Sequence, residues 1–243
     1  MPSKINVSFN MHPRWIANSQ PSDFLSPLRE AGLDTLEFEL DRHLPDWPAF
    51  PDLMEACFEM GFNLCFHAPY RVPNGIAGFS SSHRNEILEN YQPMLSIAQR
   101  FADRSGKWLN VVVHGAKSSE RDIASLKDDT VQFLSWCLAE FPGLRIAFEI
   151  AGPAEQGEIK IGGDRAGVWE VISAFDNARL GICWDMGHDH LNGASNLPDM
   201  EWLKKVIHVH AHDVDEKGID HFPFVFGRVP YLDWLPALKQ VGM

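Results

Sequence analysis

The chain has 243 residues, 45% hydrophobic and 22% charged, which is the balance of a globular protein with a full core, and we expect one domain over residues 1–243. No apolar stretch reaches the roughly 18 residues of a membrane span, and a net charge of −12 without a basic cluster disfavours nucleic-acid partners. The four cysteines lie within apolar patterns and no signal peptide precedes the first strand, so a cytoplasmic location is expected.

Short apolar segments alternate with amphipathic helices along the chain. The expected strands are Ile5–Asn10, Leu33–Leu40, Phe62–Phe66, Trp108–Val113, Arg145–Phe148, Leu180–Asp185 and Val206–Asp213. The expected helices are Ser22–Ala31, Trp47–Met60, Ser81–Asp103, Ser118–Glu140, Asp164–Phe175, Leu197–Lys205 and one ending near Gln240. This pattern predicts an α/β fold with parallel strands, a (β/α)₈ barrel whose active site forms at the carboxyl ends of the strands. A doubly wound sheet is disfavoured because no glycine-rich phosphate loop follows the first strand.

The chain provides only seven of the strands that such a barrel needs. It stops at Gln240-Val241-Gly242-Met243, where the last helix ends and an eighth strand would begin. Without that strand, the first and seventh strands each keep one edge of unpaired backbone groups. We therefore expect an open or irregular seam between Ile5–Asn10 and Val206–His212, closure of the seam in a homo-oligomer, or a sequence truncated before strand eight.

Residues that bind divalent metals follow five consecutive strands. They are His67, His114, Glu149, Asp185 with His188, and His210 with His212. One such histidine is more often structural, but the same chemistry at five strand ends predicts a converging metal site. Gly187 would let the chain turn so that Asp185 and His188 aim at one point. The alternative is that Asp185 caps the next helix beside a solvated His188.

Two of the predicted strands carry polar residues at period two. Glu37 and Glu39 share one face of Leu33–Leu40, where they are either solvated or directed into a barrel interior in which they need partners. The sequence leaves both alternatives open. His208, His210 and His212 also share a face, and one metal ion cannot use all three rings. Some of these histidines must therefore orient ligands or face the substrate.

Several motifs occur together in a specific order: His-Ala-Pro-Tyr after the third strand, Val-Val-His-Gly after the fourth, Phe-Glu-Ile after the fifth, Trp-Asp-Met-Gly-His after the sixth, and His-Ala-His-Asp with Asp220-His221-Phe222-Pro223 after the seventh. This set resembles the xylose-isomerase-like TIM-barrel superfamily over nearly the whole chain. That superfamily includes sugar isomerases and epimerases and the endonuclease IV type of abasic-site nuclease (AP endonuclease family 2). The motifs are specific to the superfamily and not to a substrate.

The resemblance implies a bound divalent ion, Mn²⁺, Co²⁺, Mg²⁺ or Zn²⁺, with the ligands Glu149, Asp185 and His210. In the multi-metal nuclease branch the matching ligands also include His67, His114, His188 and His221. Two features depart from the family pattern. The nuclease branch has Asp-x-His, whereas here Ile219 stands two places before His221 and the aspartate is Asp220. The metal-binding glutamate of the eighth strand has no counterpart in the sequence.

We therefore expect a metal-dependent isomerase or epimerase that acts on a small sugar, sugar phosphate or related polyol through an enediolate. Glu149 is the candidate general base, and His188 is a catalytic or substrate-contacting group. The other candidate substrate contacts are His67, His114, His212 and Arg71, the last of which is equally well a solvated loop residue. The alternatives are a metal-dependent phosphodiester hydrolase on abasic DNA, which lacks a basic track here, and a non-catalytic metal- or sugar-binding barrel.

Overall fold

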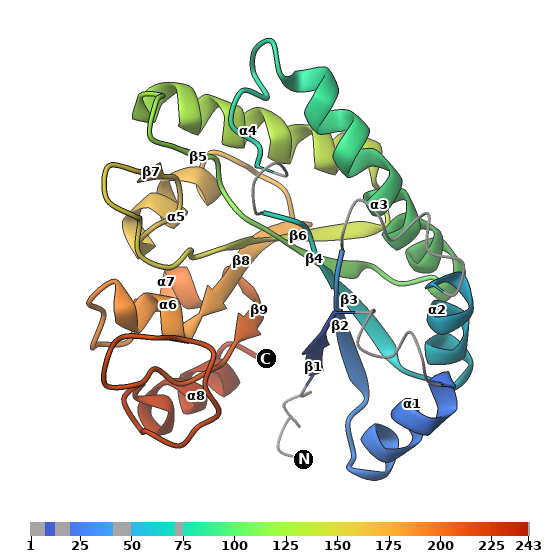
Figure 1. The fold of residues 1–243 in the computed structure, drawn as a ribbon. Helices are drawn as coiled ribbons and strands as arrows, with labels where there is room; N and C mark the ends of the chain where they lie inside the picture. The colour runs from blue at the N-terminus through green and yellow to red at the C-terminus, as the bar shows by residue number, and fades with distance from the viewer. Residues whose placement is uncertain (1–7, 13–19, 41–49, 71–74, 243) are drawn as a thin grey trace.

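The structure is a computed structural model that describes residues 8–12, 20–40, 50–70 and 75–242. Seven parallel strands form one curled sheet (Figure 1). In spatial order they are β1 (Ser8–Met11), β2 (Thr35–Glu39), β3 (Asn63–His67), β4 (Leu109–Val113), β6 (Leu144–Glu149), β8 (Leu180–Asp185) and β9 (Val206–His210). Each strand pairs with the next in chain order apart from the short β5 and β7, so the predicted α/β barrel-type fold is confirmed.

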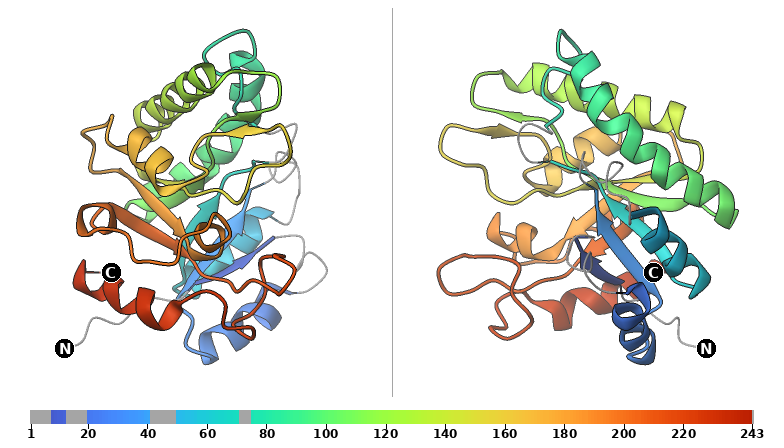
Figure 2. Two further views of the ribbon diagram at one scale, coloured as in Figure 1. Left: turned by 90° about the vertical axis from the view of Figure 1, so that its left-hand side faces the viewer. Right: turned by 45° about the vertical axis from the view of Figure 1, so that its right-hand side comes forward.

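Helices cover the outer face of the curved sheet (Figures 1 and 2). They are α1 (Pro21–Glu30), α2 (Phe50–Glu59), α3 (Arg84–Ser105), α4 (Ile123–Glu140), α5 (Arg165–Ile172), α6 (Met186–Leu191), α7 (Met200–Leu203) and α8 (Tyr231–Gln240). Aspartates start several of them; Asp122, for example, accepts the backbone N–H of Ser125 at 2.9 Å at the start of α4. Every described helix is too short or too polar to cross a lipid bilayer.

The alternation of side chains along the strands separates two layers of packing. Outward residues such as Phe148 join the main core between sheet and helices. Inward residues Val112, Ala147 and Cys183 form a small separate cluster inside the curled sheet. This cluster fills the interior below the level of Glu149, the last residue of β6. Polar residues are therefore concentrated at the carboxyl ends of the strands.

The sheet has an open seam between its two outer strands. Within the described residues no backbone ladder joins β1 to β9, as expected from the seven-strand pattern. A side chain bridges the two strands instead. Glu37, on β2, accepts a hydrogen bond from Asn10 on β1 at 2.6 Å, and its other oxygen lies 2.6 Å from Nε2 of His208 on β9.

Some element boundaries differ from the prediction. Strands β5 (Lys117–Ser118) and β7 (Ile159–Lys160) form a separate antiparallel pair that is too short to show a periodic signal. Helix α6 follows β8 directly, and the predicted helix at Leu197–Lys205 shortens to α7. The start of the predicted first strand and of the helix at Trp47 lie outside the described residues.

Candidate active site

A cavity of about 830 Å³ opens at the carboxyl ends of the strands. Its lining includes residues that follow β3, β4, β6, β8 and β9, together with the inward face of β2. Three of the predicted residues, His67, His114 and Glu149, face it from consecutive strands or strand ends. The parallel arrangement thus brings together side chains that are more than 80 residues apart in the sequence, as in the pair His67 and Glu149.

Glu149 lies among four imidazoles, and its side chain is only 1% exposed. Its Oε2 is 2.8 Å from Nε2 of His114 and 3.2 Å from Nε2 of His67. Its Oε1 is 3.0 Å from Nδ1 of His210 and 3.7 Å from Nδ1 of His188. Burial alone would raise the pKa of Glu149, but His114 and His210 outweigh it and hold the pKa well below the ordinary value. Glu149 is therefore ionised at neutral pH.

Asp185 both caps α6 and lies beside the His188 ring, so the two arrangements that the sequence left open are not exclusive. Its Oδ1 accepts the backbone N–H of His188 at 2.8 Å and so caps α6. Its Oδ2 lies 3.2 Å from Nδ1 of the same residue, and His212 Nε2 is 2.9 Å from Oδ1. His188 is buried, not solvated. Burial lowers the pKa of His188, but Asp185, Asp220 and Glu149 together more than compensate and raise the pKa to about 9.

The predicted ligands Glu149, Asp185 and His210 converge. His210 Nδ1 is 3.0 Å from Glu149 and 3.7 Å from Asp185. One ligand atom from each of Glu149, Asp185 and His188 also lies within 4.8 Å of the other two. Carboxylate oxygens and imidazole nitrogens at these separations suit a divalent ion, whose bonds to such atoms are about 2.0–2.3 Å long. The donor set therefore fits the implied metal, and its role as a ligand set stays a prediction.

Glu37 is a site residue that sequence reasoning did not assign. It points into the interior and is 1% exposed. Besides Asn10 and His208, its carboxylate contacts His210, with Oε1 3.0 Å from Nε2. Burial would raise the pKa of Glu37, but His210 and His208 outweigh it and hold the pKa well below its ordinary value. The period-two pattern of β2 placed Glu37 opposite Leu36 and Phe38 but could not say which face was interior.

The loop after β9 brings a second unassigned carboxylate to the cavity. Asp220 Oδ2 is 3.3 Å from Nε2 of His188, and its Oδ1 is 3.0 Å from Nδ1 of His221. The shift of the aspartate by one place relative to the nuclease motif therefore leaves it in contact with the site. His221, a predicted metal ligand, lies at the rim with a side chain 65% exposed. Its ligand atom is within 4.8 Å of those of His188 and His212.

The remaining predicted contacts are placed as follows. His212 stacks on His221, with ring centroids 4.2 Å apart, and lines the cavity. His114 stacks on Tyr70 at the same centroid distance of 4.2 Å. Arg71 lies outside the described residues.

Residues 25–243 match the family described as the xylose isomerase-like TIM barrel. The chain belongs to this family. A curated relative, an uncharacterized protein of Methanocaldococcus jannaschii, is 33% identical over 78 residues, or 30% of this chain. The match spans only 26% of that relative's length.

Solved structures of this xylose isomerase-like fold resemble the whole chain. A D-tagatose 3-epimerase-like protein superposes with a TM-score of 0.71 at 23% identity, covering 97% of this chain and 87% of its own. D-psicose 3-epimerase from Clostridium cellulolyticum H10, with D-tagatose, gives 0.69 at 13% identity, with 96% and 81% covered. An AP endonuclease, family 2, from Brucella melitensis gives 0.64 at 15% identity, with 91% and 83% covered. At these identities the likeness shows the fold alone.

Proposed function

We propose that this protein is a divalent-metal-dependent isomerase or epimerase of a small sugar or related polyol, which works through an enediolate. The observation that carries the proposal is the buried, ionised Glu149 at the cavity, with imidazoles on both of its oxygens and Asp185 close by. Family membership and the sugar epimerases among the similar folds support it. The partner is then a small molecule and not a macromolecule.

The residues that would hold the ion are Glu149, Asp185 and His210, with His188 beside them. A bound divalent ion would hold adjacent oxygens of the sugar and stabilise the negative charge that develops when a proton leaves the carbon beside the carbonyl. All four side chains are buried or largely buried, so little of their surface touches water and their electrostatic interactions with a substrate are strengthened.

Proton transfer falls to residues with opposite protonation states. Glu149 is ionised and can accept the proton from carbon. His188, with its pKa raised to about 9, is protonated at neutral pH and can donate a hydrogen bond to a substrate oxygen. His67 and His114 face the other carboxylate oxygen of Glu149 and hold it in position.

Deuterium wash-in tests the proposal whichever sugar is the product. The protein, loaded with Mn²⁺, Co²⁺, Mg²⁺ or Zn²⁺ in D₂O, is incubated with a panel of aldoses and ketoses, and mass spectrometry follows solvent deuterium in the sugar. We expect one deuterium to enter at the carbon beside the carbonyl of at least one sugar. Glu149→Gln should slow this at least about 100-fold, the usual contribution of a general base.

The control is Glu140→Gln, which removes the same charge from the exposed end of α4 and should match the wild type. A protein that binds metal but exchanges no carbon-bound hydrogen in any sugar would contradict the proposal and favour a binding barrel.

A second candidate, hydrolysis of abasic-site DNA, is supported by one observation. Besides Glu149, Asp185 and His210, the cavity holds a second group of possible ligands, the buried His188 and His212 and the exposed His221 at the rim, so there are donors for more than one ion. The net charge of −12 opposes this candidate, because phosphate contacts must first overcome repulsion.

A further inference from the structure

We propose that Glu37 is a positioning residue. It accepts a hydrogen bond from the ring nitrogen of His210 that faces away from Glu149 and Asp185, and this bond orients the ring for metal binding. The inference rests on the proposed metal-dependent function and adds a residue from β2 to it. It concerns how the ligand is held, not which atoms bind the ion.

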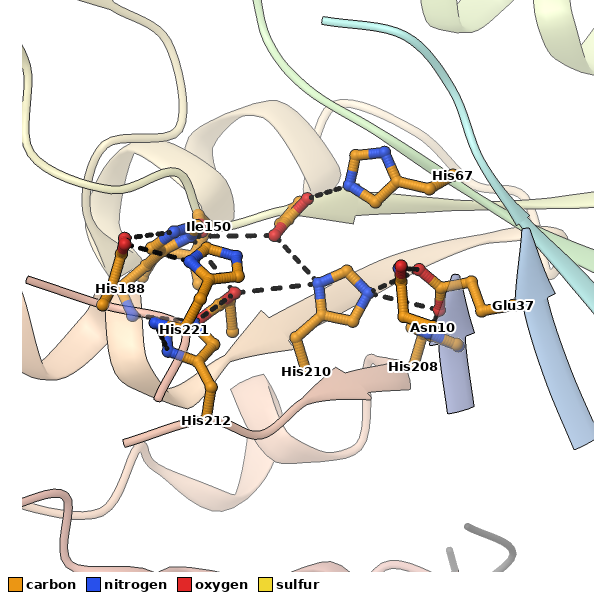
Figure 3. Close-up of polar contacts among 12 residues, drawn as sticks. Asn10, Glu37, His67, Ile150, His188, His208, His210, His212 and His221 are labelled. Carbon is orange, nitrogen blue, oxygen red and sulfur yellow. Dashed lines mark hydrogen bonds and ion pairs between the residues drawn. The ribbon is translucent and has the colours of Figure 1, made fainter. Parts of the chain in front are cut away.

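The His210 ring lies between two carboxylates (Figure 3). Its Nδ1 faces Glu149 Oε1 at 3.0 Å, and its Nε2 faces the two oxygens of Glu37 at 3.0 and 3.3 Å. A neutral imidazole that binds a metal through one nitrogen carries a proton on the other. The geometry therefore assigns Nδ1 as the ligand atom and Nε2–H as the donor to Glu37. Such a hydrogen bond fixes the ring and makes the ligand nitrogen more basic.

Glu37 is itself held in place by neighbours on two other strands. Asn10 on β1 donates to Oε1 at 2.6 Å, and Nε2 of His208 on β9 lies 2.6 Å from Oε2. Its 1% exposure and the bond from Asn10 leave the carboxylate little freedom to rotate or to be replaced by water even without the contact from His208. A fixed acceptor is what a positioning residue needs.

Two other roles for Glu37 are distinguishable from this one. Glu37 could ligate the ion, but its ligand atoms group with those of Cys65 and His208, on the far side of the His210 ring from Glu149. It could alternatively serve only to tie β9 to β1 and β2 across the open seam. His208 is the other β9 histidine that contacts Glu37. In that case, loss of His208 should lower metal affinity as much as loss of the contact between Glu37 and His210.

The test compares Glu37→Gln with His208→Gln in the Co²⁺-loaded protein. The N–H of a Co²⁺-bound imidazole gives a proton NMR signal shifted far outside the normal range, and a buried carboxylate acceptor slows its exchange with water. We expect one such slowly exchanging signal in the wild type, assigned by its loss in His210→Gln. In Glu37→Gln it should disappear or exchange at least about 10-fold faster, and Co²⁺ affinity should fall about 10- to 100-fold.

His208→Gln removes the seam contact and leaves the bond between Glu37 and His210, so the signal should persist and Co²⁺ affinity should stay within about threefold. Glu140→Gln controls for the change in charge, and circular dichroism checks that each variant is folded. If Glu37→Gln does not fold, Glu37→Asp replaces it; the shortened carboxylate should give an intermediate loss of affinity and faster exchange.

An unchanged signal and affinity in the folded Glu37 variant would overturn the inference. Equal losses in Glu37→Gln and His208→Gln would also overturn it, in favour of a purely structural tie. Both results leave the proposed function standing. A wild-type protein that takes up no Co²⁺ or other divalent ion would overturn the proposed function and this inference together.

Discussion

At the scale of single residues, the candidate site is a set of buried opposite charges. Glu149 and Asp185 have pKa values held below their ordinary range, while His188 and His210 have theirs raised. The carboxylates and imidazoles stabilise one another in the metal-free protein, and a bound ion would replace part of this positive charge. This mutual neutralisation makes the stability of the metal-free protein depend on pH.

The first prediction concerns this pH dependence. The pKa of His188 rises from 6.5 to about 9 on folding, so its contribution is complete below about pH 6.5 and is lost as the pH rises through about 9. Glu149 and Asp185, whose pKa values are lowered by folding, stabilise the folded state above about pH 4.5. This contribution is lost as the pH falls below that value. Urea unfolding in a chelator should therefore show greatest stability near pH 5–6.5 and a decrease of order 2 kcal/mol by pH 9.5. His188→Gln should make this decrease smaller and leave the part due to His210. Stability that rises from pH 6.5 to 9 would contradict the assignment.

The second prediction concerns Gly187, where the chain passes close to a site histidine. A Cβ atom there would lie 2.1 Å from Cε1 of His212, so the ring would have to leave its contact with Asp185. Although alanine is favoured over glycine inside a helix, Gly187→Ala should destabilise the protein by about 1–3 kcal/mol in urea unfolding. The matched control is Gly163→Ala, where the nearest atom is 3.6 Å away and little change is expected. Equal stability of the two variants would refute the close approach.

At the scale of elements, the connection between β9 and α8 has an isolated bridge, Asp213 with Phe222, and otherwise little regular structure, yet it supplies Asp220 and His221. Its shape is set by the fully buried Asp213. The carboxylate of Asp213 accepts backbone N–H groups from Phe226 and Gly227 at 2.7 Å each, and others from Val214, Arg228 and Val229. The Asp213 side chain thus satisfies backbone N–H groups that strand pairing would satisfy in a regular sheet.

The third prediction is that Asp213→Asn loosens this loop. The amide has one oxygen in place of two, and its NH₂ group would face backbone N–H donors, so a loss of about 2–4 kcal/mol is expected. Hydrogen exchange at residues 226–229 should accelerate. Asp215→Asn is the control, since Asp215 accepts from Lys217 and Ile219 in an exposed turn and should cost less. Unchanged exchange at residues 226–229 would show that Asp213 does not hold the loop.

At the scale of the whole molecule, the net charge of −12 separates the two enzymatic candidates. A protein that acts on DNA gains most of its affinity from phosphate contacts with Lys and Arg. The fourth prediction is that fluorescence anisotropy at about 0.15 M salt detects no association with an abasic duplex. Salt-sensitive binding in the micromolar range or tighter would instead favour the nuclease over the sugar enzyme.

The sequence alone determined the order of strands and helices and the chemical character of the strand ends. Hydrophobic periodicity is a local property, so it located β3, β4, β6 and β8 to within one or two residues. Parallel strands in a barrel present their carboxyl ends to one place, so the sequence also predicted that Glu149, Asp185 and His210 would lie together.

Only the tertiary structure decided which partners each of these groups has. The curl of the sheet decided whether Glu37 is solvated or interior, because it brings β9 across from β2. This curl is set by contacts between residues about 170 positions apart in the chain. The position of Asp220 depended on an irregular loop held by Asp213, for which no periodic signal exists. Long-range packing also decides which nitrogen of His210 faces which carboxylate. The neighbours of a residue in the sequence indicate the strand in which it lies, but they do not encode the surroundings of its side chain.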